Sequence, residues 1–327
     1  MTRRALRLVV MMIRPPVMVA VLLFAAVGVA QAGGHGLHPL FTIVPFVVGG
    51  WFVHATVLND LGDEPIDRVN LGNARGRPLV SGDATPSELL ALGRVAGVVS
   101  FTAAWAVDWR VAGVVAAGLL LNAAYSMRPV RLCDRGGLAS FLLPTGYVAV
   151  PYMVGVLSMR PVLRGDDLLL MAGLYVGFVG RILLKDFRDV RGDGMFGKRT
   201  FLLRHGPLAT CQLSGLCWVL GTGLLLLVVP LRSAVMLAVA SLLACALHGL
   251  RELASSDGFV RQQVVIGAIA VCGRGMGVTL LAHLTMAGQG WAAVAKAMVV
   301  ATVSLLYMGM YRVTLAQRER VLTIRPY

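Results

Sequence analysis

Long apolar runs recur ten times along the 327-residue sequence, and they constrain the fold more than any other feature. A transmembrane helix needs about 20 predominantly apolar residues to cross roughly 30 Å of hydrocarbon. The pattern therefore predicts an all-α, multi-spanning transmembrane helical bundle of nine to ten helices. The runs cover residues 17–33, 40–58, 92–108, 110–127, 138–157, 167–184, 208–229, 232–249, 264–286 and 291–311.

The composition agrees with a membrane protein and excludes other classes. Hydrophobic residues make up 57% of the chain and charged residues 14%, whereas a soluble domain carries about 25% charged residues. The net charge of +14 does not indicate a nucleic-acid partner, because the basic residues lie between apolar runs rather than in one domain. The longest polar stretch, residues 59–87, is too poor in apolar residues for a core of its own, so residues 1–327 are predicted to form a single domain.

The distribution of Lys and Arg predicts the orientation. Cytoplasmic loops carry an excess of these residues. If the N-terminus is cytoplasmic, 23 of the 30 basic residues fall inside and only four outside. We therefore expect a multi-pass protein with both termini in the cytoplasm, in the plasma membrane of a prokaryote.

Two acidic segments on this cytoplasmic side carry the chemistry. Asn59, Asp63 and Asp67 are spaced i, i+4, i+8, which places them within about 80° of one helical face. Lys185, Asp189 and Asp193 repeat the spacing, and the two segments hold seven of the 16 acidic residues. Like charges at this spacing destabilise a helix unless they are neutralised. A divalent cation such as Mg²⁺, which binds carboxylates together with phosphate oxygens, is the natural candidate.

Basic residues accompany both acidic segments. Acidic groups for a metal and basic groups for phosphate together indicate a diphosphate site. The alternative is that the segments are solvated loops with incidental acids. The basic residues concerned are Arg77, Arg181, Lys185, Arg188, Lys198 and Arg199.

These segments resemble the motifs of a known family. Asn59–Asp67 and Arg77–Gly82 are similar to the NDxxDxxxD and RPLxSG signatures of the UbiA superfamily of intramembrane prenyltransferases. Lys185–Asp193 and Gly197–Thr200 resemble its second motif, KDxxDxxGD with GKRT. Tyr125–Leu132 is similar to the Y-x-x-x-P-x-R-L connection of the same family. The resemblance covers essentially the whole chain.

The resemblance implies a central cavity open to the cytoplasm and Mg²⁺-dependent transfer of an isoprenyl group from an allylic prenyl diphosphate. An aromatic acceptor is expected; a phosphorylated acceptor, a terpene cyclase or a cation transporter are the alternatives. The partners are these two substrates and the lipid bilayer, with no nucleic acid and no obligate protein partner. The expected catalytic and metal-binding residues are Asp63, Asp67, Asp189 and Asp193. The expected substrate-binding residues are Asn59, Asp60, Arg77, Tyr125, Arg131, Arg181, Lys185 and Lys198. Arg274, in the middle of a span, suits a structural ion pair as well as a substrate contact.

Two features depart from the family pattern. The family has nine spans, whereas hydropathy and charge here indicate ten. Pro65 falls between Asp63 and Asp67 and, with Gly62, predicts an interruption of the first motif helix. We therefore expect a kink or a new turn to present Asp67.

Overall fold

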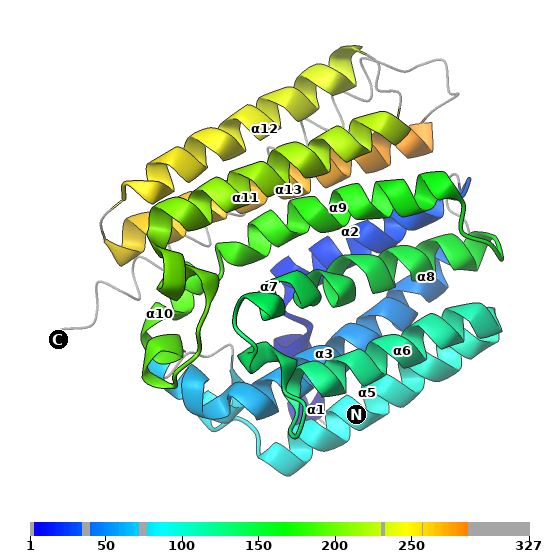
Figure 1. Ribbon diagram of the computed structural model, residues 1–327. Helices are drawn as coiled ribbons and strands as arrows, with labels where there is room; N and C mark the ends of the chain where they lie inside the picture. Colours follow the sequence, from blue (N-terminus) through cyan, green and yellow to red (C-terminus); the bar gives the residue numbers. More distant parts are fainter. Residues whose placement is uncertain (1–2, 35–39, 72–76, 230–232, 257, 287–327) are drawn as a thin grey trace.

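The structure is a computed structural model that describes residues 3–34, 40–71, 77–229, 233–256 and 258–286 (Figure 1). Within these residues every regular element is helical. The predicted helical bundle is therefore confirmed. The elements are α1 (Arg3–Ile13), α2 (Pro15–Gln31), α3 (Leu40–Leu71), α4 (Pro78–Ser81), α5 (Pro86–Val107), α6 (Trp109–Ser126), a 3₁₀ turn (Leu132–Asp134), α7 (Gly137–Pro144), a π-helical turn (Thr145–Ala149), α8 (Val150–Met159), α9 (Gly165–Leu183), α10 (Asp186–Met195), α11 (Phe201–Val228), α12 (Ser233–Ala254) and α13 (Phe259–Met286).

Nine of the ten apolar runs coincide with these helices. In the described part of the chain, six helical segments are long and apolar enough to cross a membrane, and two bent pairs raise the number to eight. The bent pairs are α1 with α2, at 66°, and α9 with α10, at 57°. The fourth run, 110–127, forms α6, which is 18 residues long and is not among these eight. The tenth run, 291–311, lies outside the described residues.

Helix ends follow local signals in the sequence. Thr85 caps α5 in a capping box with Glu88, and Pro86 occupies the first helical turn, where a proline loses no hydrogen bond. Asp108 ends α5 and caps α6 by accepting a hydrogen bond from the N–H of Arg110 at 2.7 Å. These signals mark the boundary between the third and fourth apolar runs.

The expected interruption of α3 at Pro65 is wrong. The helix continues from Leu40 to Leu71 with Pro65 inside it. Contacts beyond the proline hold the last turns: Ile66 is buried, and the side chain of Asn70 accepts a hydrogen bond from the N–H of Gly192 at 2.6 Å. These tertiary contacts offset the backbone hydrogen bond that Pro65 cannot donate.

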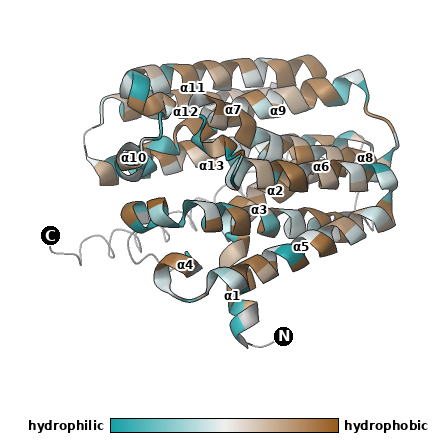
Figure 2. Ribbon diagram, turned by 60° about the horizontal axis from the view of Figure 1, so that its bottom comes forward, coloured by the Kyte–Doolittle hydropathy of each residue, from teal (hydrophilic) through white to brown (hydrophobic). Residues whose placement is uncertain are grey.

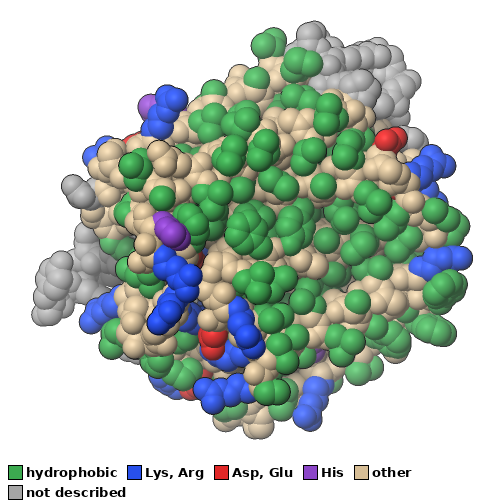
Figure 3. All heavy atoms as spheres, viewed as in Figure 1, with side chains coloured by type: hydrophobic (Ala, Val, Ile, Leu, Met, Phe, Trp, Pro, Cys, Tyr) green, Lys and Arg blue, Asp and Glu red, His purple; other side chains and the backbone are tan. Residues whose placement is uncertain are grey.

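The bundle contains several apolar cores. One lies among α2, α3, α5, α6 and α8, around Trp51 and Phe52, and another among α10 to α13, around Leu253 and Ile269. Figure 2 shows that the long helices carry mainly hydrophobic residues. In Figure 3 hydrophobic side chains cover the middle of the visible face, while Lys and Arg gather toward its edges. This is the surface of a protein embedded in lipid.

Glycines allow the helices to approach closely. A Cβ atom added at Gly155 of α8 would lie 2.1 Å from the carbonyl oxygen of Ala25 in α2, and one at Gly28 would lie 2.3 Å from that of Tyr152. Small residues at such crossings are how membrane helices pack without a hydrophobic driving force.

Candidate active site

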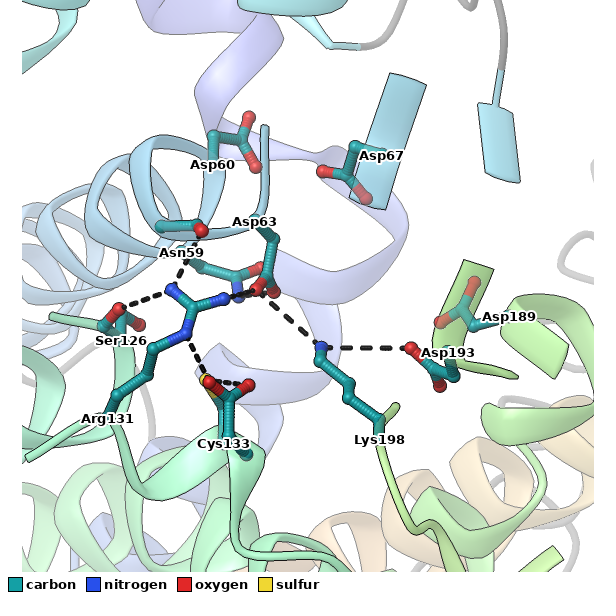
Figure 4. Close-up of polar contacts among 12 residues, drawn as sticks. Asn59, Asp60, Asp63, Asp67, Ser126, Arg131, Cys133, Asp189, Asp193 and Lys198 are labelled. Carbon is teal, nitrogen blue, oxygen red and sulfur yellow. Dashed lines mark hydrogen bonds and ion pairs between the residues drawn. The ribbon is translucent and has the colours of Figure 1, made fainter. Parts of the chain in front are cut away.

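The two acidic segments converge at one end of the bundle. The ammonium nitrogen of Lys198 lies 3.6 Å from Oδ1 of Asp63 in α3 and 3.7 Å from Oδ1 of Asp193 in α10 (Figure 4). The hydrogen bond from Gly192 to Asn70 ties the same two helices together. A Cβ atom at Gly192 would lie 2.5 Å from the side chain of Asn70, so any larger residue would displace the side chain that accepts this hydrogen bond.

The bend between α9 and α10 places the second motif. The direction of the chain changes by 57° at Leu184 and Lys185. Leu184 and Phe187 are buried in the core of α10 to α13 and hold α10 in this orientation. As a result Asp189 and Asp193 face the motif carried by α3.

A cavity of about 60 Å³ lies between the motifs, and we call it the acidic pocket. Its walls combine carboxylates, cations and amides from four segments of the chain. The predicted site residues that line it are Asn59, Asp63, Asp67, Arg77, Tyr125, Lys185, Asp189, Asp193 and Lys198. The sequence analysis thus named nine residues that share one cavity.

Asp60, another predicted substrate-binding residue, is not among the described lining residues of the acidic pocket. Its carboxylate is buried and pairs with the guanidinium groups of Arg14 and Arg77. Arg77 also lies 3.2 Å from Asp67. Asp60 therefore orients Arg77, which lines the pocket itself.

Arg131, also a predicted substrate-binding residue, is not among the described lining residues of the acidic pocket but holds Asp63 in place. Its Nη2 atom donates to Oδ1 of Asp63 at 2.9 Å, and its Nη1 atom donates to the carbonyl oxygen of Gly62 at 2.7 Å (Figure 4). Asn59 donates to the other carboxylate oxygen of Asp63 at 2.8 Å. Asp63 is thus fixed from two sides.

Electrostatics at the pocket mouth keep Lys198 charged. Burial acts to lower the pKa of Lys198, but the carboxylates of Asp63 and Asp193 outweigh it, and the net pKa lies above the ordinary value. Burial, assisted by Asp63, raises the pKa of the Cys133 thiol to about 11. At neutral pH the pocket therefore presents an ammonium group and a neutral thiol.

The sequence analysis missed five polar residues of the pocket as site candidates: Asn70, Cys133, Ser140, Asp186 and Thr200. Asn70 follows Asn59 by 11 residues, which places it within about 20° of the same helical face, so the spacing could have identified it. Asp186 stands in the second motif, but its position does not repeat the spacing of Lys185, Asp189 and Asp193.

The donor set suits a magnesium ion shared with a phosphate. No three Asp, Glu, His or Cys side chains in the described residues lie close enough together to hold an ion by themselves. Mg²⁺ usually takes one or two carboxylates and completes its shell with phosphate oxygens and water. Asp186 carries a buried Oδ2 atom with no hydrogen-bond partner among the described residues. This atom is a further oxygen donor available to the ion. The residues present therefore fit the ion.

A second cavity, of about 720 Å³, opens beside the acidic pocket, and we call it the large chamber. Its walls are mainly apolar and come chiefly from α1, α2, α9, α11 and α13, with Phe24, Phe178 and Trp218 among the lining residues. The predicted substrate-binding residue Arg181 lies here rather than in the acidic pocket, as does Arg274. The volume is in the range of small-molecule sites.

A third cavity of about 60 Å³, the connecting chamber, lies among Trp51, Phe52, Tyr125 and Tyr147. Asn59, Leu143 and Lys185 line all three cavities. The charged and apolar compartments therefore meet at these residues.

Fold and site together define a bundle of membrane-spanning helices in which a charged pocket opens onto a mainly apolar chamber. The family model of the UbiA prenyltransferase family matches residues 21–262. The chain belongs to the UbiA prenyltransferase family.

Curated relatives match over part of their length. The chain is 26% identical over 188 residues to the bacteriochlorophyll synthase 34 kDa chain of Chloroflexus aurantiacus, which covers 58% of each chain. It is 30% identical over 173 residues to the homogentisate phytyltransferase of a Synechocystis species, which covers 49% of this chain and 55% of the relative. The chain thus spans a little over half the length of these relatives.

Solved structures share the fold. A digeranylgeranylglyceryl phosphate synthase aligns with a TM-score of 0.65 and 16% identity, over 86% of this chain and 99% of its own. A UbiA homologue from Archaeoglobus fulgidus bound to GPP and Mg²⁺ aligns with a TM-score of 0.61 and 15% identity, over 84% of this chain and 99% of its own.

Proposed function

We propose that this protein transfers an isoprenyl group from an allylic prenyl diphosphate to an aromatic acceptor, with Mg²⁺ as cofactor. The observation that carries the proposal is the acidic pocket, in which carboxylates and cations of two distant motifs meet. Membership of the UbiA prenyltransferase family supports the reaction type. The names of the Chloroflexus and Synechocystis relatives support an aromatic acceptor.

The carboxylates would hold the metal. Asp63 and Asp67 from α3 and Asp189 and Asp193 from α10 would hold Mg²⁺ one or two at a time, together with phosphate oxygens, while Asn59 keeps Asp63 in place. Bound there, the ion would neutralise negative charge on the diphosphate. The Archaeoglobus neighbour that binds GPP and Mg²⁺ supports this cofactor.

The cations of the pocket would bind the diphosphate and favour its departure. Lys185, Lys198 and Arg77 line the pocket and would donate to phosphate oxygens. Negative charge grows on the leaving group as the C–O bond breaks, so these donors stabilise the transition state more than the ground state. The hydrocarbon tail would lie in the large chamber, where apolar walls exclude water.

The test is direct. The purified protein is incubated with Mg²⁺, an allylic diphosphate of 10 to 20 carbons and a panel of aromatic and phosphorylated acceptors, and the lipids are identified by mass spectrometry. We expect a prenylated aromatic product that is lost when the metal is chelated. A prenylated phosphate ester, a cyclised hydrocarbon without acceptor, or cation transport without consumption of diphosphate would each refute the proposal.

Variants of the motifs test the site. Asp63→Asn and Asp189→Asn are expected to abolish turnover while leaving the protein folded. Asp166→Asn is the matched control, since Asp166 is exposed at the start of α9, outside the three cavities. Full activity in either motif variant would show that the substituted aspartate has no role in catalysis.

The orientation remains part of the proposal. We infer that the acidic pocket faces the cytoplasm, because 23 basic residues fall on that side of the predicted topology and four on the other. A reporter fused at the N-terminus should be found inside the cell. A reporter found outside would reverse the topology.

A further inference from the structure

Helix packing accounts for all but one of the described glycines that line the large chamber. These glycines are Gly173, Gly177, Gly221, Gly273 and Gly277. A Cβ atom added at any of them except Gly177 would lie 2.6–2.9 Å from an atom of a neighbouring helix. A Cβ atom added at Gly177 would meet no described atom within 4 Å. The space beside Gly177 is therefore open.

This open space belongs to the chamber. Leu174, Phe178 and Arg181 also line the chamber from α9, and residues three and four positions apart share one face of a helix. The packing of α11 restricts position 221 instead, because a Cβ atom at Gly221 would lie 2.6 Å from the backbone nitrogen of Gly177. Glycine is less favourable than alanine inside a helix. Neither packing nor helix stability therefore accounts for glycine at position 177.

Four helices contribute to the chamber wall at the level of Gly177. Helices α2, α9, α11 and α13 lie side by side there (Figure 1). The rings of Phe24 in α2 and Phe178 in α9 are in contact, with centroids 5.6 Å apart. A Cβ atom at Gly277 in α13 would lie 2.7 Å from the side chain of Leu23 in α2. We call this level of the chamber the collar; its residues are Leu23, Phe24, Gly177, Phe178, Gly221 and Gly277.

The collar lies a short distance from the acidic pocket. Ile182 and Lys185 line both the acidic pocket and the large chamber, so α9 passes from one to the other there. Gly177 precedes these residues by five and eight positions, which corresponds to about 8–12 Å along the helix. Three bonds of an extended backbone span about 3.5 Å, so the four main-chain bonds of one isoprene unit span about 4.5 Å. An isoprenyl chain of two units therefore ends near the collar, and a longer chain must pass it.

The chamber continues beyond the collar. Gly173, Leu174, Leu225 and Leu280 line this further part, and Gly173 lies about 6 Å beyond Gly177 along α9. Leu174 and Leu280 belong to the same apolar core. The space past the collar is therefore suited to more hydrocarbon and not to a polar group.

We propose that Gly177 is a specificity-determining residue that admits isoprenyl chains of more than two units, 15 to 20 carbons long. The inference rests on the proposed prenyl transfer. The missing side chain at position 177 leaves the collar open to the third and fourth isoprene units. A larger residue at this position would occupy their path without contacting the diphosphate or its first two units.

The experiment measures kcat/KM of the purified full-length protein for geranyl and geranylgeranyl diphosphate, with 10 and 20 carbons, in the presence of Mg²⁺ and the acceptor found in the product assay. The variants are Gly177→Ala, Gly177→Leu and Gly177→Phe. The ratio of kcat/KM for geranylgeranyl over geranyl diphosphate should fall as the side chain grows. We expect about a 10- to 100-fold loss for Gly177→Leu, because atoms forced into occupied space are strongly disfavoured.

The control is Gly223→Leu. Gly223 is an exposed glycine of α11 that lies outside the three cavities, and a Cβ atom there would also meet no described atom within 4 Å. This variant should leave the ratio unchanged. The melting temperature of each variant in detergent shows that the protein remains folded.

Three results would overturn the inference. They are a ratio that does not depend on the residue at position 177, equal losses for both diphosphates in a folded variant, or the same change of ratio in Gly223→Leu. A wild type that uses geranyl but not geranylgeranyl diphosphate would contradict only the role of Gly177. If the wild type consumes neither diphosphate, the proposed function itself fails.

Discussion

Replacing Lys198 by methionine tests how the two motifs cooperate. The ammonium group lies within 4 Å of carboxylates from both α3 and α10, and its side chain is only 14% exposed. At an effective dielectric constant of about 20, a pair of charges about 4 Å apart interacts with about 4 kcal/mol before desolvation is counted. Lys198 therefore links α3 and α10 across the acidic pocket, and under the proposed function the same ammonium group would bind phosphate.

The Lys198→Met variant should change two quantities in opposite directions. Losing a charge-assisted hydrogen bond to the diphosphate costs about 1.5–3 kcal/mol, which lowers kcat/KM about 10- to 150-fold. The apparent affinity for Mg²⁺ should rise, because Asp63 and Asp193 lose a competing cation. Steady-state kinetics over a range of diphosphate and Mg²⁺ concentrations measures both.

The controls isolate the role of the charge. Lys198→Arg keeps a cation and should recover most of kcat/KM. Arg261→Met removes a cation from an exposed ion pair with Glu252, at the start of α13, and should leave both quantities unchanged. If Lys198→Met matched wild type in kcat/KM and in its dependence on Mg²⁺, the charge of Lys198 would have no role in binding the diphosphate or the metal.

Three further substitutions follow from the contacts. Gly192→Ala places a Cβ atom 2.5 Å from the side chain of Asn70, so it should destabilise the protein by about 1–3 kcal/mol and lower the melting temperature in detergent; an unchanged melting temperature would argue against close contact of α3 and α10. Asp60→Asn removes the partner that orients Arg77, so KM for the diphosphate should rise severalfold with little change in kcat, and an unaltered KM would contradict this role. Gly155→Leu cannot fit against α2 and should abolish accumulation of folded protein, whereas normal yield would show that this crossing tolerates a side chain.

The sequence by itself determined the class of fold and most of the pocket. Apolar runs of about 20 residues admit only helices that satisfy their own backbone in lipid, and nine of the ten runs coincide with described helices. The spacing of Asn59, Asp63 and Asp67 fixed their common face, because helical geometry depends on local periodicity alone.

Only the tertiary structure decided which helices and side chains lie in contact. The continuity of α3 through Pro65 depends on Asn70 and Gly192, which are brought together by folding. The ion pairs of Lys198 with Asp63 and Asp193 likewise depend on contacts between residues distant in the sequence. The same holds for the stacking of Tyr147 on Phe178. Local periodicity determines which face of its own helix each side chain occupies. Which face of another helix lies opposite is determined by helix packing, and that packing depends on the whole chain.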